Sequence, residues 1–289
     1  MTSKPVLAIL NPPPPHMVGD GFRVHNFFPS GFKLNMSPFF LLDYNAKIEF
    51  SARNEPRGVG VHPHRGFETV TLAYHGAVAH HDSAGNSGII YPGDVQWMTA
   101  ASGVLHKEYH EKAFSKKGGP FQMVQLWVNL PAKDKMSTPK YQALKQSELA
   151  KVELPDDAGI IEVIAGHFNR EKGSVSTFTP IEMYNARLTK GGKVSFNFPA
   201  HYNTAFVIIE GEIKVNDSAI AKVDQMVHFK NEGEVIEIEG LANSVVLILS
   251  GEPINEPVTQ YGPFLMNTPE EIQQAIADYN EGKFGYLED

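Results

Sequence analysis

Short runs of strand-forming residues, separated by turn residues, extend through almost the whole chain and most constrain its fold. Residues 67–74 (FETVTLAY) and 121–130 (FQMVQLWVNL) are rich in aromatic and β-branched side chains and alternate in part between polar and apolar positions. Turn residues separate such runs, as at 83–88 (SAGNSG) and 92–94 (PGD). Many short strands joined by tight turns indicate an all-β sandwich or barrel.

The second half of the chain repeats this pattern of strands and turns. Residues 181–188 and 244–249 have the composition of buried strands, and the length of 289 residues suits about two domains. Two similar β-rich halves indicate a duplicated fold. We therefore expect an all-β protein with one barrel domain over residues 1–135 and a second over residues 136–289.

One helix is predicted near the end of the chain. Residues 268–271 (TPEE) supply an N-cap threonine, a proline at the first helical position and a glutamate at the third, which together form a capping box. Ile272, Ala275 and Ile276 then fall on one face. The sequence therefore predicts a short C-terminal helix over about residues 269–281.

Composition excludes several classes of protein. The chain has no cysteine, which excludes disulfides, thiolate zinc sites and iron–sulfur clusters. No apolar run approaches the roughly 20 residues of a transmembrane helix, and the run at 6–10 is too short for a signal peptide. We therefore expect a cytoplasmic protein with no membrane partner. With 25 basic and 33 acidic residues and no dense basic patch, direct binding to nucleic acid is not expected.

Seven of the twelve histidines lie between residues 62 and 110, where two pairs of residues have strand spacing. His62 and His64 form a His-x-His pair, and His106 and Glu108 form a His-x-Glu pair. Because residues i and i+2 of a strand point to the same face, each pair can direct both side chains at one ion. The turns between the pairs could fold one opposite the other, which would place three imidazoles and one carboxylate on one cation.

A ligand set of imidazoles and a carboxylate, without thiolate, suits a divalent transition metal: Fe, Mn, Co, Ni, Cu or Zn. Four protein ligands in an octahedral field leave two open positions, which favours iron and oxygen chemistry over four-coordinate zinc. A lone His-x-His pair is common by chance. From the spacing alone, a metal site and a chance grouping of histidines remain equal alternatives.

Several motifs around these residues resemble the pirin family of the cupin superfamily. They are GVHPHRGFETVT at 60–71, HDSAGN at 81–86, PGDVQWMTA at 92–100, GVLHKE at 103–108, QLWVNL at 125–130, GEP at 251–253 and GPFLMNT at 262–268. The resemblance extends from about residue 19 to residue 285, and the run HPHRGFE is highly specific.

The resemblance implies two tandem cupin (jelly-roll-type) β-barrels with one metal, usually iron(II), in the N-terminal barrel. It places the four ligands at His62, His64, His106 and Glu108. Mn, Co, Ni, Cu and Zn are alternatives to iron, and no other cofactor is expected. The C-terminal barrel is expected to hold no metal, since residues 201–203 (HYN) stand where a second His-x-His pair would lie.

Some pirins cleave flavonols such as quercetin with O₂. The resemblance therefore implies a 2,3-dioxygenase that takes a small aromatic, flavonol-like substrate and O₂ and releases CO. Glu108, by its position, would be the catalytic residue that accepts the proton of the substrate hydroxyl. Two alternatives stay open. One is an iron-binding, redox-sensitive regulatory protein that modulates a transcription factor or a metabolic enzyme as its protein partner, and the other is a zinc-dependent cupin isomerase.

Four further residues are candidates for the pocket or for contacts with the ligands. Arg65 could hold an anionic group or orient a ligating carboxylate, or it could lie at the surface. Glu68 could contact the centre or make only structural polar contacts. Met98 and Gln125 are candidates for the cavity wall. His80, by contrast, is expected to flank a turn in contact with solvent.

Overall fold

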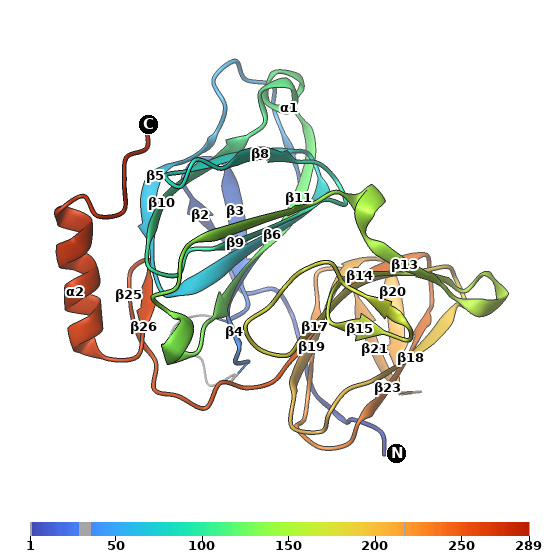
Figure 1. The fold of residues 1–289 in the computed structure, drawn as a ribbon. Coiled ribbons are helices and arrows are strands. Elements are labelled where there is room, and N and C mark those ends of the chain that lie inside the picture. Colours follow the sequence, from blue (N-terminus) through green and yellow to red (C-terminus); the bar gives the residue numbers. More distant parts are fainter. Residues whose placement is uncertain (1, 29–35, 217, 289) are drawn as a thin grey trace. The chain divides into compact units, whose positions relative to one another are not determined.

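The computed structural model describes residues 2–28, 36–216 and 218–288, and strands dominate it (Figure 1). Two compact units divide the chain between them. The first unit comprises residues 14–32, 39–146 and 254–289, and the second unit comprises residues 1–13, 33–38 and 147–253. Both units are therefore built from segments that are distant in the sequence.

Two antiparallel sheets form the first unit. The seven-stranded sheet has the order β12 (Lys140–Leu144), β9 (Val95–Thr99), β6 (Phe67–His75), β11 (Gly119–Asn129), β4 (Phe39–Phe50), β3 (Phe22–Asn26) and β2 (His16–Val18). The four-stranded sheet has the order β5 (Gly58–His64), β10 (Val104–His110), β7 (Val78–Asp82) and β8 (Ser87–Ile90). A short helix, α1 (Lys112–Lys117), connects the two sheets between β10 and β11.

The second unit repeats this arrangement of one seven-stranded and one four-stranded sheet. The larger sheet has the order β1 (Val6–Leu10), β22 (Met226–Phe229), β19 (Asn203–Glu210), β24 (Ser244–Gly251), β17 (Ile181–Leu188), β14 (Gly159–Ala165) and β13 (Ala150–Glu153). The smaller sheet has the order β18 (Lys193–Asn197), β23 (Val235–Gly240), β20 (Glu212–Val215) and β21 (Ala219–Lys222). Between β14 and β17 in the sequence, β15 (His167–Phe168) and β16 (Glu171–Lys172) form a separate two-stranded sheet. The expected all-β, duplicated fold is confirmed.

The interiors of the two units differ in polarity. One apolar cluster fills the second unit, with Tyr184, Phe196 and Phe206 among its buried rings. In the first unit an apolar cluster that includes Phe121 and Met123 fills only part of the interior. Buried polar side chains occupy part of the remainder. The buried polar groups indicate a functional site in the first unit, because burying polar groups is costly unless they are paired.

The end of the chain forms a β-hairpin and a helix. The hairpin pairs β25 (Thr259–Tyr261) with β26 (Phe264–Met266), and α2 (Pro269–Asn280) follows it. The capping box is present, since the Thr268 side chain accepts a hydrogen bond from the Glu271 amide and the Glu271 side chain accepts one from the Thr268 amide. The predicted helix is confirmed. None of the helices in the described ranges is long and apolar enough to cross a membrane.

This C-terminal segment belongs to the first unit. Phe264, Ile272 and Phe284 form an apolar cluster against which Leu105 packs. The sequence predicts a single division after residue 135, whereas the compact units exchange segments. The physical reason for the C-terminal exchange is the apolar face of α2, which is buried in the first unit, where Leu105 packs against its cluster.

A buried ion pair fastens α2 to the first unit. Arg65 Nη1 donates to Asp278 Oδ2 at 2.8 Å, and the two side chains are 5% and 10% exposed. Arg65 Nε also donates to the carbonyl oxygen of Ser102 at 2.7 Å, and the guanidinium carbon lies 4.6 Å from the centroid of the Phe284 ring. Arg65 therefore joins the end of β5, the loop before β10 and the C-terminal segment.

Candidate metal centre

Strands β5 and β10 bring three histidines together. The two strands pair antiparallel, with His62 opposite His106 and His64 opposite Val104. One ring nitrogen from each of His62, His64 and His106 lies within 4.8 Å of the other two. The His-x-His spacing is responsible, because it places both imidazoles on one face of β5.

The separation within the His-x-His pair suits two ligands of one ion. The Nε2 atoms of His62 and His64 are 3.0 Å apart. Two nitrogens about 2.1 Å from a metal and at right angles to each other would be separated by about 3.0 Å. His62 Nδ1 lies 2.8 Å from the carbonyl oxygen of Gly60, so the Nδ1–H can donate there and leave the Nε2 lone pair directed at the cluster.

Unpartnered nitrogen atoms in the cluster also suit a metal site. Among the described residues, neither ring nitrogen of His106 has a hydrogen-bond partner, and neither has Nδ1 of His64. Burial lowers the pKa of His62 and lowers the pKa of His64 and His106 well below the usual value, so all three rings are neutral near pH 7. Neutral imidazoles with free lone pairs are the form that binds metals, and this donor set fits a divalent transition metal.

Glu108, the fourth predicted ligand, has a different environment. It lies two residues beyond His106 on β10, but the group of ligand atoms within 4.8 Å consists of the three imidazoles and does not include its carboxylate, as far as the described residues go. Both carboxylate oxygens accept hydrogen bonds from Gln125 Nε2 at 3.0 Å. Burial raises the pKa of Glu108 to about 7. Its role as a ligand stays a prediction.

The other predicted pocket residues divide into two groups. Gln125 and Met98 lie on the interior face, since Gln125 bonds Glu108 and Met98 is buried in a cluster with Val104. Arg65 points elsewhere, to Asp278 of α2.

Glu68 also points away from the interior. Ala73 of the same strand lies in the interior cluster, and side chains alternate along a strand, so Glu68 faces the other side of the sheet. There it accepts a hydrogen bond from Thr99 Oγ1 at 2.7 Å, and burial raises its pKa to about 7.

Sequence reasoning was wrong about His80. Its side chain is fully buried, and in the antiparallel pairing of β7 with β10 it lies directly opposite Glu108. Its Nδ1 lies 3.2 Å from Gln96 Nε2, and its Nε2 lies 2.6 Å from the Tyr141 hydroxyl oxygen. The alternation of β7, in which Val78 is a core residue, was the signal that could have placed His80 inside.

Three more polar residues of the interior were missed. Asp43, Thr71 and Gln96 are all buried in the first unit. Burial and, after it, the nearby Glu108 carboxylate raise the pKa of Asp43 to about 6. Thr71 and Gln96 lie within the motifs at 60–71 and 92–100, but those motifs do not tell which strands are neighbours, and Asp43 lies in none of the motifs.

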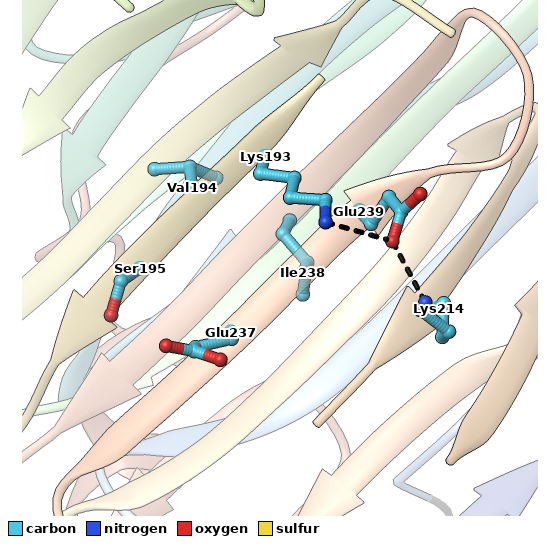
Figure 2. Close-up of a pocket in the computed structure, with 7 residues that line it drawn as sticks. All are labelled: Lys193, Val194, Ser195, Lys214, Glu237, Ile238 and Glu239. Carbon is cyan, nitrogen blue, oxygen red and sulfur yellow. Dashed lines mark ion pairs between the residues drawn. The ribbon is translucent and has the colours of Figure 1, made fainter. Parts of the chain in front are cut away.

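The second unit offers a surface depression of another kind (Figure 2). It measures about 250 Å³ and lies over β18, β20 and β23. Glu239 Oε2 lies 2.8 Å from Lys214 Nζ and 3.6 Å from Lys193 Nζ, as the dashed lines mark. These are partly exposed ion pairs, which are common on protein surfaces and contribute little energy. The depression therefore carries no chemistry comparable with that of the histidine cluster.

Comparison with known proteins gives consistent similarities along the chain. The family model described as pirin matches residues 21–128, and that described as the pirin C-terminal cupin domain matches residues 183–285. A Pseudomonas aeruginosa protein named "Putative quercetin 2,3-dioxygenase" is 45% identical over 282 residues, covering 97% of this chain and 98% of that protein. Human pirin is 38% identical over 274 residues, covering 93% and 90%.

A solved structure is similar over the full length. The crystal structure of a quercetin 2,3-dioxygenase from Acinetobacter baumannii is 44% identical, with a TM-score of 0.93, and the match covers 99% of this chain and 100% of that one. The expected pair of cupin domains is thereby confirmed, since both the fold and the two family models agree with it.

Proposed function

The chain belongs to the pirin family, and from this premise we propose that it is an iron(II)-dependent dioxygenase that cleaves flavonols such as quercetin with O₂. The observation that carries the proposal is the cluster of neutral imidazoles of His62, His64 and His106, of which the last two are buried and have unpartnered nitrogen atoms. The names of two relatives that are 44% and 45% identical supply the substrate class.

The proposed metal ligands are the three imidazoles together with Glu108. When bound, the metal supplies Lewis acidity toward the 3-hydroxyl and 4-carbonyl oxygens of the substrate and allows O₂ to react there. The imidazoles hold it in a site without thiolates, which suits oxygen chemistry. Mn, Co, Ni, Cu and Zn are the metals against which iron must be tested.

Glu108 is proposed to accept the proton of the substrate 3-hydroxyl. In the metal-free protein, burial raises the pKa of Glu108 to about 7, so this carboxyl group binds a proton more readily than an exposed one. Gln125 donates hydrogen bonds to both carboxylate oxygens and so fixes the orientation of the carboxyl plane. These two residues thus prepare the substrate as an enolate before the ring opens and CO is released.

Exchanging Glu108 for Gln should lower CO release by roughly 100-fold or more, because an amide cannot accept the hydroxyl proton. CO release is measured with metal-loaded protein, with circular dichroism to verify the fold. The matched control is Glu68→Gln, since Glu68 is an equally buried carboxylate with a similarly raised pKa that faces away from the interior. Unchanged CO release by metal-loaded Glu108→Gln protein would exclude this role.

One experiment tests the function as a whole. The purified protein is analysed for bound metal, and O₂ uptake and CO release are followed with a panel of flavonols. We expect iron and flavonol-dependent O₂ uptake. Tightly bound zinc without any O₂ dependence would favour an isomerase instead, and iron without turnover of any flavonol would favour a regulatory protein.

A further inference from the structure

The first unit carries polar residues in its interior at positions where the second unit carries hydrocarbon. In the second unit, β17, β19 and β24 direct Tyr184, Phe206 and Val246 into one apolar cluster. In the first unit, β4 and β6 instead bury Asp43 and Thr71. Both units have the same arrangement of sheets, so the fold does not require these polar residues. Residues that depart from an apolar core without structural need indicate a function.

Strand pairing places these polar residues in one row. Asp43 of β4 pairs with Gln125 of β11, which pairs on its other side with Thr71 of β6. Thr71 in turn pairs with Gln96 of β9. Cross-strand neighbours have their Cβ atoms about 4.5–5.5 Å apart on the same face of a sheet. We call this continuous row of Asp43, Gln125, Thr71 and Gln96 the polar belt.

The polar belt lies at the level of Glu108. Gln125 donates to both carboxylate oxygens of Glu108 at 3.0 Å. At the other end of the belt, Gln96 Nε2 lies 3.2 Å from Nδ1 of His80, which itself pairs with Glu108 across β7 and β10. The belt therefore contacts Glu108 through Gln125 and His80 through Gln96, and the His80 ring centroid lies 6.2 Å from that of His106.

Mostly apolar side chains border the belt on the side away from His62, His64 and His106. The next interior row pairs Ala73 of β6 with Met123 of β11, and both belong to the apolar cluster with Phe121. On the opposite side lies Trp127, whose ring centroid is 5.8 Å from that of His64. The belt thus lies between the histidine cluster and a row in which Ala73 and Met123 are apolar and Asn45, the strand neighbour of Met123, is polar.

Three atoms of the belt lack partners. Asp43 Oδ1, Thr71 Oγ1 and Gln96 Oε1 have no hydrogen-bond partner within the described ranges, although their residues are only 7%, 1% and 1% exposed. Buried polar atoms in folded proteins are nearly always hydrogen-bonded to protein, water or ligand. Carboxylate and amide oxygens accept, and the threonine hydroxyl both donates and accepts. Hydroxyl groups, which do both, would satisfy all three.

We propose that the polar belt recognises the ring hydroxyl groups of a polyhydroxylated aromatic substrate. The proposal rests on the flavonol chemistry proposed above and concerns hydroxyls other than the 3-hydroxyl that reacts. A site built to hydrogen-bond hydroxyls rejects an analogue without them, because its buried polar atoms then lose their partners. The belt thus makes the protein select polyphenols over flat aromatic compounds of similar size.

Anaerobic binding separates recognition from turnover. Iron(II)-loaded protein is titrated under nitrogen with quercetin and with 3-hydroxyflavone, which keeps the 3-hydroxyl and 4-carbonyl but lacks the other hydroxyls. We expect the wild type to prefer quercetin and Thr71→Val to lose about tenfold in affinity for quercetin alone. Thr71→Ser, which restores a hydroxyl, should recover most of that loss. Asp43→Asn is the second variant, in case Thr71→Val does not fold.

The outcomes distinguish this proposal from the proposed reaction. Equal binding of the two flavonols by the wild type, or quercetin binding by both variants as tight as that of the wild type, overturns the belt as a recognition site and leaves it as a site for buried water. The same samples are then exposed to air and CO is measured. Selective binding without CO release refutes the dioxygenase activity and supports recognition by the belt. CO release without selective binding supports the dioxygenase activity and refutes recognition by the belt.

Discussion

Replacing His106 with alanine is expected to abolish stoichiometric metal binding and flavonol turnover together. Both ring nitrogens of His106 are buried and unpartnered, so the imidazole has no structural hydrogen bond that would explain its position. Even residues that only support metal ligands contribute about 10–100-fold to metal affinity, so loss of a ligand should lower affinity by more than about 100-fold. Metal content per chain and the affinity for added iron(II) measure the effect.

The same substitution should leave the metal-free fold intact. Removing a buried polar ring that lacks partners costs packing but no hydrogen bond, so the melting temperature of the metal-free variant should stay near that of metal-free wild type. His228→Ala is the matched control, since His228 is a buried histidine of the second unit with an unpartnered Nδ1. That control should retain full metal content. A His106→Ala protein with unchanged metal content would refute the assignment of the centre.

Arg65→Met is expected to destabilise the first unit by about 1.5–3 kcal/mol, the usual contribution of a hydrogen bond to a charged group. The substitution removes the hydrogen bonds that Arg65 donates to Asp278 Oδ2 and to the Ser102 carbonyl oxygen, while methionine preserves much of the hydrophobic volume. Asp278 Oδ1 keeps its contacts with Lys283 and Gln274, so the carboxylate retains a charged partner. Because Arg65 directly follows His64, we also expect weaker metal binding as β5 loosens.

Tryptophan fluorescence measures the stability of the first unit separately from that of the second. Both tryptophans of the chain, Trp97 and Trp127, lie in the first unit, so their emission in a urea titration reports on that unit while circular dichroism reports on both. Arg187→Met is the control, since Arg187 pairs with Glu162 in the second unit and is 34% exposed. It should leave the fluorescence transition unchanged. If the urea midpoint of Arg65→Met, measured by fluorescence, coincides with that of the wild type, the contacts of Arg65 add no stability to the first unit.

The sequence predicted those features that depend on local pattern. Alternation and turn residues predicted an all-β fold, and Thr268 with Glu271 predicted the start of α2. The spacing of His62 and His64 predicted two imidazoles on one face, because that relation holds within a single strand. A local pattern is sufficient for such features, since no other part of the chain has to be known.

Features that depend on strand register could not be predicted. Alternation along β7 could have placed the His80 side chain inside, but its position opposite Glu108 follows from the pairing of β7 with β10. The row from Asp43 to Gln96 crosses four strands, and an irregularity between Gln122 and Met123 shifts the register of two of them. Periodicity tells which face a residue occupies, but it does not tell which residues are its neighbours.

Because segments of the two units alternate along the chain, the parts of the first unit are synthesised at different times. The strands that carry His64 and His106 leave the ribosome before the 107 residues from 147 to 253 that build most of the second unit, and Asp278 emerges only after them. At about 5–20 residues per second, that interval lasts roughly 5–20 s. Until it has passed, a nascent chain presents its imidazoles without the Arg65–Asp278 ion pair, so we expect the finished polypeptide to bind a metal more tightly than the growing one.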